Sequence, residues 1–299
     1  MVADGDGVRL AGSVWLPAAT APRGLILMHP GSGPSDRDND ILFPPIRSAL
    51  LAGGVAVCSF DKRGVGGSSG RWLEAGIGRQ AGDLARGLCA AREIAPAGPV
   101  GLFGHSQGGW VVLEAVRLVR PAFVITNSGP SVSPFEQEEY STRNRLRRAG
   151  WGAAEVDSGV LLFRQFLDMA RSGLSFEQAR SRMAGRHDEL RALADAGAFV
   201  PDSDAMWSHA ASVLGYDPGP ALADIAVPLL AIFGASDAVV PVADCVERLR
   251  RVVPSRLVHL DVVDGGDHRI QRDDTDEFVP GYLAALTAFV EGQLRGAEA

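Results

Sequence analysis

Short apolar runs alternate with longer amphipathic stretches along most of the 299-residue chain. Strand-like runs, bounded by Gly, Pro or polar residues, are expected at Val8–Leu16, Gly24–Met28, Val55–Phe60, Val100–Phe103, Phe123–Asn127, Leu229–Phe233 and Leu257–Val262. Apolar residues at helical spacing predict helices at Ile41–Leu51, Arg79–Arg92, Gly109–Val119, Val242–Val253 and Thr275–Leu294. Continuously apolar strands that alternate with helices are typical of an α/β fold with a mostly parallel, doubly wound sheet.

The alternation of strands and helices stops between residues 131 and 222. This stretch has a polar, helical pattern without strand-like runs, and it is too long for a simple connection. We therefore expect a core domain made of residues 1–130 and 223–299, with residues 131–222 inserted as a helical cap over the carboxyl edge of the sheet. Trp151, Met206 and Trp207 are expected in the interior of the cap or in a substrate wall.

Composition narrows the class of protein. Apolar residues make up 46% of the chain and the net charge is −7, which is ordinary for a soluble enzyme and argues against nucleic acid as a partner. The sequence contains no apolar run of 18 residues and starts without a signal-peptide pattern, so no membrane association and a cytoplasmic location are expected. The three cysteines favour neither a disulfide framework nor a zinc site.

The strongest chemical signal is the run GHSQGG at residues 104–109. It follows an expected strand and leads directly into an expected helix, so the G-x-S-x-G pattern predicts a nucleophile elbow with Ser106 at its tip. The pattern alone is weak, because residues 66–70 (GGSSG) match it too. The run that follows Ser68 does not begin an apolar helix, so we interpret that second match as a glycine-rich loop.

A nucleophilic serine needs a base, and the base needs a carboxylate that orients it. His268 lies in a turn-rich loop after the last or penultimate strand, and Asp237 follows the strand that ends near Phe233. Asp264 and Asp267 are alternatives for the acid because they are near His268 in sequence. We expect Asp237, since carboxylates just past a strand end lie where α/β active sites assemble. The order Ser106, Asp237, His268 is that of α/β-hydrolases.

Four motifs in this order resemble the α/β-hydrolase superfamily over essentially the whole chain. The similarity is to bacterial serine esterases and acyl-peptidase-like hydrolases, and it rests on GSGPSDRD at 31–38, DKRGVGGS at 61–68, the Ser106 elbow and the Asp237 loop. The resemblance implies an α/β-hydrolase fold, hydrolysis of carboxylic esters, and no metal or organic cofactor.

The loop after the third strand departs from the family pattern at Pro30, which has no N–H to offer an oxyanion. The donor from this loop must then be Gly31, Ser32 or Gly33, among which we favour Ser32. The second donor is expected to be the backbone N–H of Gln107, directly after the nucleophile.

The remaining charged motifs have structural interpretations. Asp61 and Arg63 are expected to tie a loop together, and residues 36–38 either do the same or cap the helix near Ile41. The arginines within 143–148 are expected on a solvated helix face.

The sequence therefore predicts a serine hydrolase acting on a small-molecule acyl substrate. A thioesterase, an amidase or peptidase, and an acyltransferase stay open because they use the same residues. A binding protein on an inactive scaffold is disfavoured by the intact Ser, Asp and His. The sequence leaves the oligomeric state open, with a homodimer as one alternative.

Overall fold

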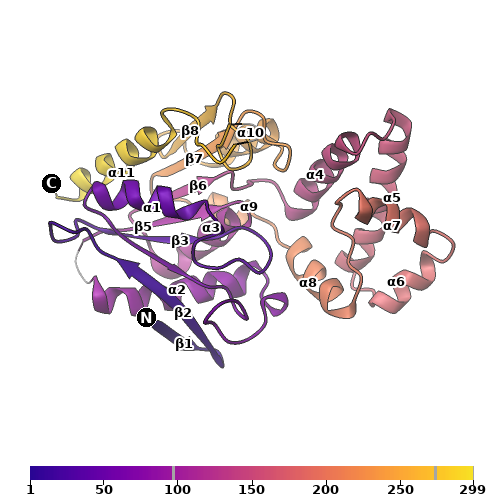
Figure 1. Ribbon diagram of the computed structural model, residues 1–299, viewed down its shortest axis with the longest axis horizontal. Coiled ribbons are helices and arrows are strands. Elements are labelled where there is room, and N and C mark those ends of the chain that lie inside the picture. Colours follow the sequence, from indigo (N-terminus) through magenta and orange to yellow (C-terminus); the bar gives the residue numbers. More distant parts are fainter. Residues whose placement is uncertain (96–97, 273–274, 299) are drawn as a thin grey trace.

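The computed structural model describes residues 1–95, 98–272 and 275–298 and contains an eight-stranded sheet with the strand order β1-β2-β4-β3-β5-β6-β7-β8 (Figure 1). All neighbours from β4 to β8 pair in parallel. The strands are β1 (Val2–Gly5), β2 (Val8–Trp15), β3 (Leu25–His29), β4 (Ala56–Phe60), β5 (Val100–His105), β6 (Phe123–Asn127), β7 (Leu229–Gly234) and β8 (Val258–Val263). The mostly parallel sheet expected from the sequence is confirmed.

The antiparallel edge of the sheet is a hairpin of β1 and β2. Its tight turn is Asp6-Gly7, where both residues have positive φ, the geometry of the two-residue turns that match strand twist. The sequence pattern predicted a strand from Val8 but placed no strand at Val2–Gly5, because this run is only four residues long and includes the charged Asp4.

Helices cover both faces of the sheet, which explains the continuous apolar strands. Along β3, Leu25 and Leu27 face a core shared with α2 (Ile77–Ile94), α3 (Gln107–Val119) and α10 (Val242–Val252). Ile26 and Met28 point the other way, into a core shared with α1 (Phe43–Ala52) and α11 (Tyr282–Glu298). Successive side chains of a strand alternate between faces, so β3 needs an apolar residue at every position.

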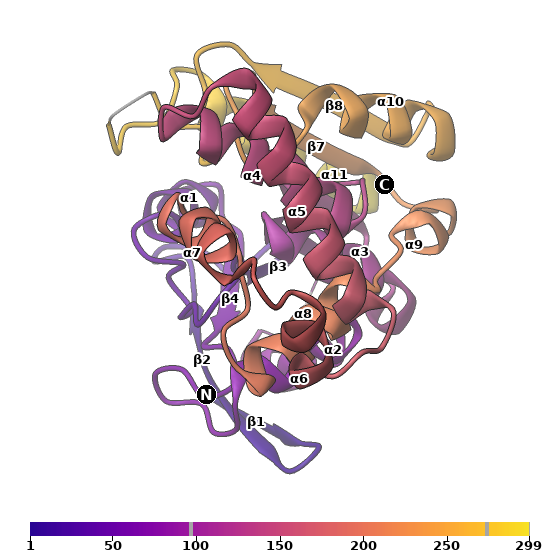
Figure 2. The ribbon, with the colours of Figure 1, turned by 90° about the vertical axis from the view of Figure 1, so that its right-hand side faces the viewer.

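The segment between β6 and β7 is helical and stands to one side of the sheet (Figures 1 and 2). Its helices are α4 (Pro134–Arg148), α5 (Ala153–Arg171), α6 (Phe176–Arg182), α7 (His187–Asp195) and α8 (Asp204–Leu214). They enclose an apolar core of their own that extends from Leu146 to Leu214, with Trp207 buried in it. The next helix, α9 (Gly219–Ala223), returns to the main core through Ala221 and Leu222. We call residues 134–214 the helical insertion.

The last helix begins later than the sequence pattern predicted. The expectation of a helix from Thr275 is wrong, because α11 starts at Tyr282, after Pro280 and a Gly281 with a φ of 91°. Residues upstream instead form an isolated bridge between Gln271 and Phe278. The apolar spacing of the last helix extends upstream to Phe278, but a glycine in the left-handed region is incompatible with a helix there.

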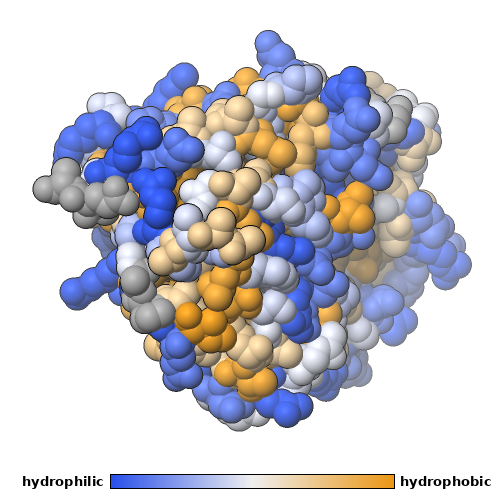
Figure 3. Space-filling view, turned by 60° about the vertical axis from the view of Figure 1, so that its left-hand side comes forward, coloured by the Kyte–Doolittle hydropathy of each residue, from blue (hydrophilic) through white to orange (hydrophobic). Residues whose placement is uncertain are grey.

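Within the described residues, no helix is long and apolar enough to cross a membrane. Figure 3 brings forward the side of the molecule away from the helical insertion, where apolar residues form small groups among hydrophilic ones. Such scattered exposure is ordinary for a protein surface and identifies no partner. The homodimer therefore stays a prediction.

Candidate active site

Ser106 lies between β5 and α3 in a strained backbone conformation, with a φ of 53° and a ψ of −123°. This turn is tight enough that a Cβ at Gly104 would overlap the Gly108 carbonyl, and one at Gly108 would overlap the His29 carbonyl. Only glycine fits at those two positions. The turn places Ser106 at the amino end of α3 and at the carboxyl edge of the parallel strands, where positive helix-end potential and ligand-binding loops meet.

His268 lies between Ser106 and Asp237 and forms a hydrogen bond with each. Its Nε2 is 3.0 Å from Ser106 Oγ, and its Nδ1 is 2.8 Å from Asp237 Oδ2. The second distance falls inside the range of 2.6–3.2 Å typical of such contacts. The Asp237 side chain is fully buried, and its Oδ1 accepts the backbone N–H groups of Val239 and Val240. This carboxylate is therefore held on both oxygens.

The alternatives for acid and nucleophile are engaged elsewhere. Asp267 uses Oδ1 to accept the backbone N–H groups of Arg269 and Gln271, while Asp264 is exposed. Ser68 Oγ donates to the Asp61 carbonyl at 2.8 Å and accepts the N–H of Ala11, so it ties a loop to β2. None of these three residues has a hydrogen bond to His268 within the described part of the chain.

His105 packs against His268, with ring centroids 5.0 Å apart, and its Nδ1 lies 3.1 Å from the Asn127 carbonyl. Burial lowers the pKa of His105 well below its ordinary value, and the neighbouring His268 adds to the effect. His105 is therefore neutral and supports the His268 ring without taking up a proton.

Helix α4 holds the loop that carries Asp237. The side chains of Gln137, Tyr140 and Asn144 donate hydrogen bonds of 2.9–3.1 Å to the carbonyls of Val239, Asp237 and Ala238. Three consecutive carbonyls are thus fixed from one helix face. The sequence analysis missed this contact, although polar residues spaced three and four apart on one helix were visible.

The backbone N–H groups of the loop after β3 differ in whether they already have a hydrogen-bond acceptor. The N–H of Gly31 donates to Asn39 Oδ1 at 3.2 Å, so Gly31 is occupied. Within the described residues, the N–H groups of Ser32 and Gln107 have no acceptor, and both residues line a cavity with Ser106. The geometry therefore favours Ser32 and Gln107 over Gly31 as donors to an oxyanion. Gly33 stays an alternative to Ser32, because its N–H also has no acceptor among the described residues and it lines the same cavity.

Two cavities open beside Ser106. One has a volume of about 420 Å³ and is lined by the oxyanion loop, α3 and the helical insertion, including Trp110, Glu138, Phe199 and Met206. The other has a volume of about 510 Å³ and is more open, with Asp36, Asp40 and Arg269 at its wall. A substrate with groups on both sides of a carbonyl carbon at Ser106 could occupy both cavities.

The charged loop motifs have structural roles, as the sequence indicated. Arg37 and Asp61 form a two-pronged ion pair, and Arg63 pairs with Asp83. The proposal that residues 36–38 cap the following helix is wrong, because no side chain caps α1 and Asp38 pairs with Arg47 instead.

Three of the four arginines within 143–148 are exposed, as expected, and the fourth, Arg143, is half-buried and pairs with Asp157. The exposed Arg145 also lines the 420 Å³ cavity and donates to the Gly197 carbonyl at 2.8 Å. Met206 lines the same cavity, whereas Trp207 belongs to the core of the insertion. The sequence could not show which of these residues line the cavity and which lie in the core of the insertion, because a helical pattern does not identify the segment that packs against each face.

Known structures share this architecture. Est1E from Butyrivibrio proteoclasticus, in a structure with bound ferulic acid, is 16% identical with a TM-score of 0.63, and the match covers 99% of this chain and 98% of that one. A proline iminopeptidase from Mycobacterium smegmatis is 17% identical with a TM-score of 0.64, covering 99% of both chains. An esterase from Pyrococcus furiosus is 18% identical with a TM-score of 0.61, covering 100% of this chain and 89% of the other.

A search of curated proteins by sequence gave no significant match. A family model described as serine aminopeptidase, S33, matches residues 41–275, which is well over half of the chain. The matched span includes the Ser106 elbow, the helical insertion, and the Asp237 and His268 loops. The chain belongs to this serine aminopeptidase family of α/β hydrolases.

Proposed function

We propose that this protein is a serine hydrolase that cleaves a carboxylic ester through a covalent acyl-Ser106 intermediate. The single observation that carries the proposal is the His268 ring, which bridges Ser106 Oγ at 3.0 Å and the buried Asp237 carboxylate at 2.8 Å. Membership of a hydrolase family and the strained serine at a helix amino end support it.

In the proposed reaction, Ser106 Oγ attacks the substrate carbonyl carbon and its proton moves to His268 Nε2. Asp237 accepts a hydrogen bond from Nδ1–H and stabilises the imidazolium. The amides of Ser32 and Gln107 donate to the oxyanion. When the tetrahedral intermediate collapses, the bond to the leaving alcohol breaks and His268 returns the proton to its oxygen. Water then attacks the acyl-serine by the same route and releases the acid.

A panel of p-nitrophenyl esters, acyl thioesters and aminoacyl anilides tests this function. Esters are expected to have the highest kcat/KM, and the open 420 Å³ cavity is expected to accept small to medium acyl groups. Thioester or anilide turnover well above that of every ester would instead identify a thioesterase or a peptidase. No turnover of any member, together with no labelling of Ser106, would contradict the proposed function.

A second candidate, hydrolysis of substrates that carry an amine on the acyl side, is favoured by Glu138. This residue projects from α4 into the lining of the 420 Å³ cavity and forms no hydrogen bond or ion pair within the described residues. Burial raises the pKa of Glu138 to about 7, although Arg145 opposes the shift. A carboxylate without an ion-pair partner in a cavity wall is costly unless a cationic group of the substrate neutralises it.

Glu138→Gln is expected to raise KM for aminoacyl p-nitrophenyl esters about tenfold at pH 7.5 and to leave KM for the matching unsubstituted acyl esters within about twofold. For wild type, the KM of aminoacyl esters is expected to pass through a minimum between pH about 7, where Glu138 becomes a carboxylate, and pH about 8, above which the α-amine of the substrate loses its proton. Steady-state kinetics on matched ester pairs measures both effects. Equal changes for charged and uncharged acyl groups would remove the amine-binding candidate and leave the ester hydrolase standing.

A further inference from the structure

Lys62 is the only lysine in the sequence, and it is buried, with 8% of its surface exposed. Its Nζ donates a hydrogen bond to the Gly31 carbonyl and another, of 3.0 Å, to Gln107 Oε1. Gly31 precedes Ser32 in the loop, so the ammonium contacts both segments that carry the expected oxyanion donors. Lys62 lines neither of the two cavities beside Ser106.

The charge on Lys62 is not balanced by an acid. Among the described residues, no carboxylate pairs with it, since the neighbouring Asp61 is held by Arg37 and Asp83 by Arg63. Burial lowers the pKa of Lys62 to about 7. A buried cation with only neutral acceptors is costly, so a negative charge that forms nearby would stabilise the protonated form of Lys62.

The contact with Gly31 acts on the Ser32 amide through one peptide unit. In a trans peptide the C=O and the N–H point in opposite directions, so fixing the Gly31 carbonyl toward Lys62 turns the Ser32 N–H away from Lys62. A Cβ built on Gly31 would lie 3.5 Å from Ser106 Cβ, which places this peptide beside the nucleophile. Polarisation of the carbonyl by the ammonium also strengthens the attached N–H as a donor.

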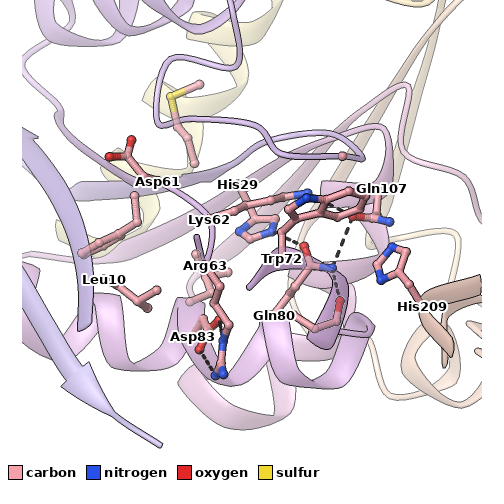
Figure 4. Close-up of a pocket in the computed structure, with 15 residues that line it drawn as sticks. Leu10, His29, Asp61, Lys62, Arg63, Trp72, Gln80, Asp83, Gln107 and His209 are labelled. Atoms are coloured by element: carbon pink, nitrogen blue, oxygen red, sulfur yellow. Dashed lines mark hydrogen bonds and ion pairs between the residues drawn. The ribbon is translucent and has the colours of Figure 1, made fainter. Parts of the chain in front are cut away.

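The contact with Gln107 is part of a chain of hydrogen bonds (Figure 4). Gln107 Oε1 accepts from Lys62 and, at 3.3 Å, from Gln80 Nε2, while Gln80 Oε1 lies 3.1 Å from His29 Nε2. Burial, assisted by the charge of Lys62, lowers the pKa of His29 to about 3, so this ring is neutral and donates to Gln80. The chain fixes the side chain of the residue whose backbone N–H is the second expected donor.

We propose that Lys62 is a positioning residue of the oxyanion hole, which aims and polarises the Ser32 and Gln107 amides and has the tetrahedral oxyanion as its counter-charge. The inference rests on the proposed function, because it needs acyl transfer at Ser106. The cavity next to Lys62 has a volume of about 20 Å³, enough for about one water molecule. Lys62 therefore acts through the two amides and does not touch the substrate.

Few titratable or charged groups face Lys62, and none of them is expected to titrate in place of Lys62 in the experiment below. His29 is neutral, and burial also lowers the pKa of His209 on α8. The other charged residues around this small cavity form ion pairs. Asp61 pairs with Arg37, and Asp83 pairs with both Arg63 and Arg86.

The decisive experiment follows Lys62 itself in the wild-type protein. Since the chain has one lysine, labelling with 15N-lysine gives a single Nζ signal, whose pKa is read from a pH titration with and without phenylboronic acid. Ser106 Oγ adds to boron and its proton moves to His268, which leaves a tetrahedral anion at the site of the oxyanion. The proton affinity of Lys62 is expected to rise at least about tenfold in the adduct, because opposite charges stabilise each other.

Linkage makes the effect reciprocal, so Lys62→Met is expected to weaken phenylboronic acid binding about tenfold at pH 6.5. It is also expected to lower kcat about 10–100-fold and to leave KM within about threefold, because amides that are misoriented lose hydrogen bonds made only in the transition state. Arg63→Met is the matched control. It removes a neighbouring buried cation that pairs with Asp83 and that, among the described residues, has no hydrogen bond to the loop of Gly31 and Ser32. Its kcat is expected to stay within about threefold of wild type.

The outcomes separate this inference from the proposed function. A boronate adduct at Ser106 with the pKa of Lys62 unmoved would overturn the role of Lys62 and leave the hydrolase intact. Absence of any adduct in wild type, as in the Ser106→Ala control, would overturn both. If Lys62→Met does not fold, the titration on wild type still decides the matter.

Discussion

Ser106→Ala is expected to abolish labelling by a fluorophosphonate probe and to lower kcat on the order of 10⁴–10⁶-fold, while the protein stays folded. Ser106 Oγ is the hydroxyl that lies 3.0 Å from His268 Nε2, and it sits at the amino end of α3 where a developing anion is favoured. Removing one oxygen at the tip of the elbow deletes the nucleophile without filling or opening the core. Probe labelling, ester kinetics and thermal unfolding measure the three parts of this result.

Ser68→Ala is the matched control, because Ser68 sits in the second G-x-S-x-G pattern of the chain. Its hydroxyl holds the Asp61 carbonyl and the Ala11 N–H, so its loss is expected to lower the melting temperature while probe labelling persists. Labelling that survives in Ser106→Ala but disappears in Ser68→Ala would show that Ser68, and not Ser106, is the nucleophile.

The local part of this architecture was accessible from the sequence. Alternating faces of β3, the glycines around Ser106 and the strand ends before Asp237 are encoded within a few residues each, where sterics and burial leave few choices. The same locality explains the errors. The apolar spacing of the last helix extends upstream to Phe278, but Pro280 and Gly281 stop any helix there, and only the structure shows the bridge that forms instead.

Contacts between segments far apart in the chain were not predictable. Nothing near Lys62 in the sequence indicates that its ammonium reaches Gly31 and Gln107, which are 31 and 45 residues away. The clamp of α4 on the Asp237 loop joins residues about a hundred positions apart, and the occupation of the Gly31 N–H depends on where the Asn39 side chain turns. These details need the packed fold, because patterns report periodicity and not partners.

Asp237→Asn is expected to lower kcat about 10²–10⁴-fold with little change in KM. The reason lies in how the carboxylate is held. Its Oδ1 accepts two backbone N–H groups, from Val239 and Val240, so the amide oxygen of an introduced asparagine must take that position. The new NH₂ group is then forced toward His268 Nδ1 and donates to it. This stabilises the tautomer with its proton on Nε2, which cannot accept the proton of Ser106.

Asp267→Asn and Asp264→Asn are the controls, since both carboxylates are near His268 in sequence. Asp267 accepts two backbone N–H groups through Oδ1, a role that an amide oxygen can keep, and Asp264 is exposed. Each is expected to retain kcat within about tenfold, measured on the same ester as Asp237→Asn. Near-wild-type turnover in Asp237→Asn with a dead Asp264→Asn would reassign the acid. The geometry supports Asp237 as the acid, because its Oδ1 is held by the N–H groups of Val239 and Val240 while α4 holds the backbone carbonyls of the same loop.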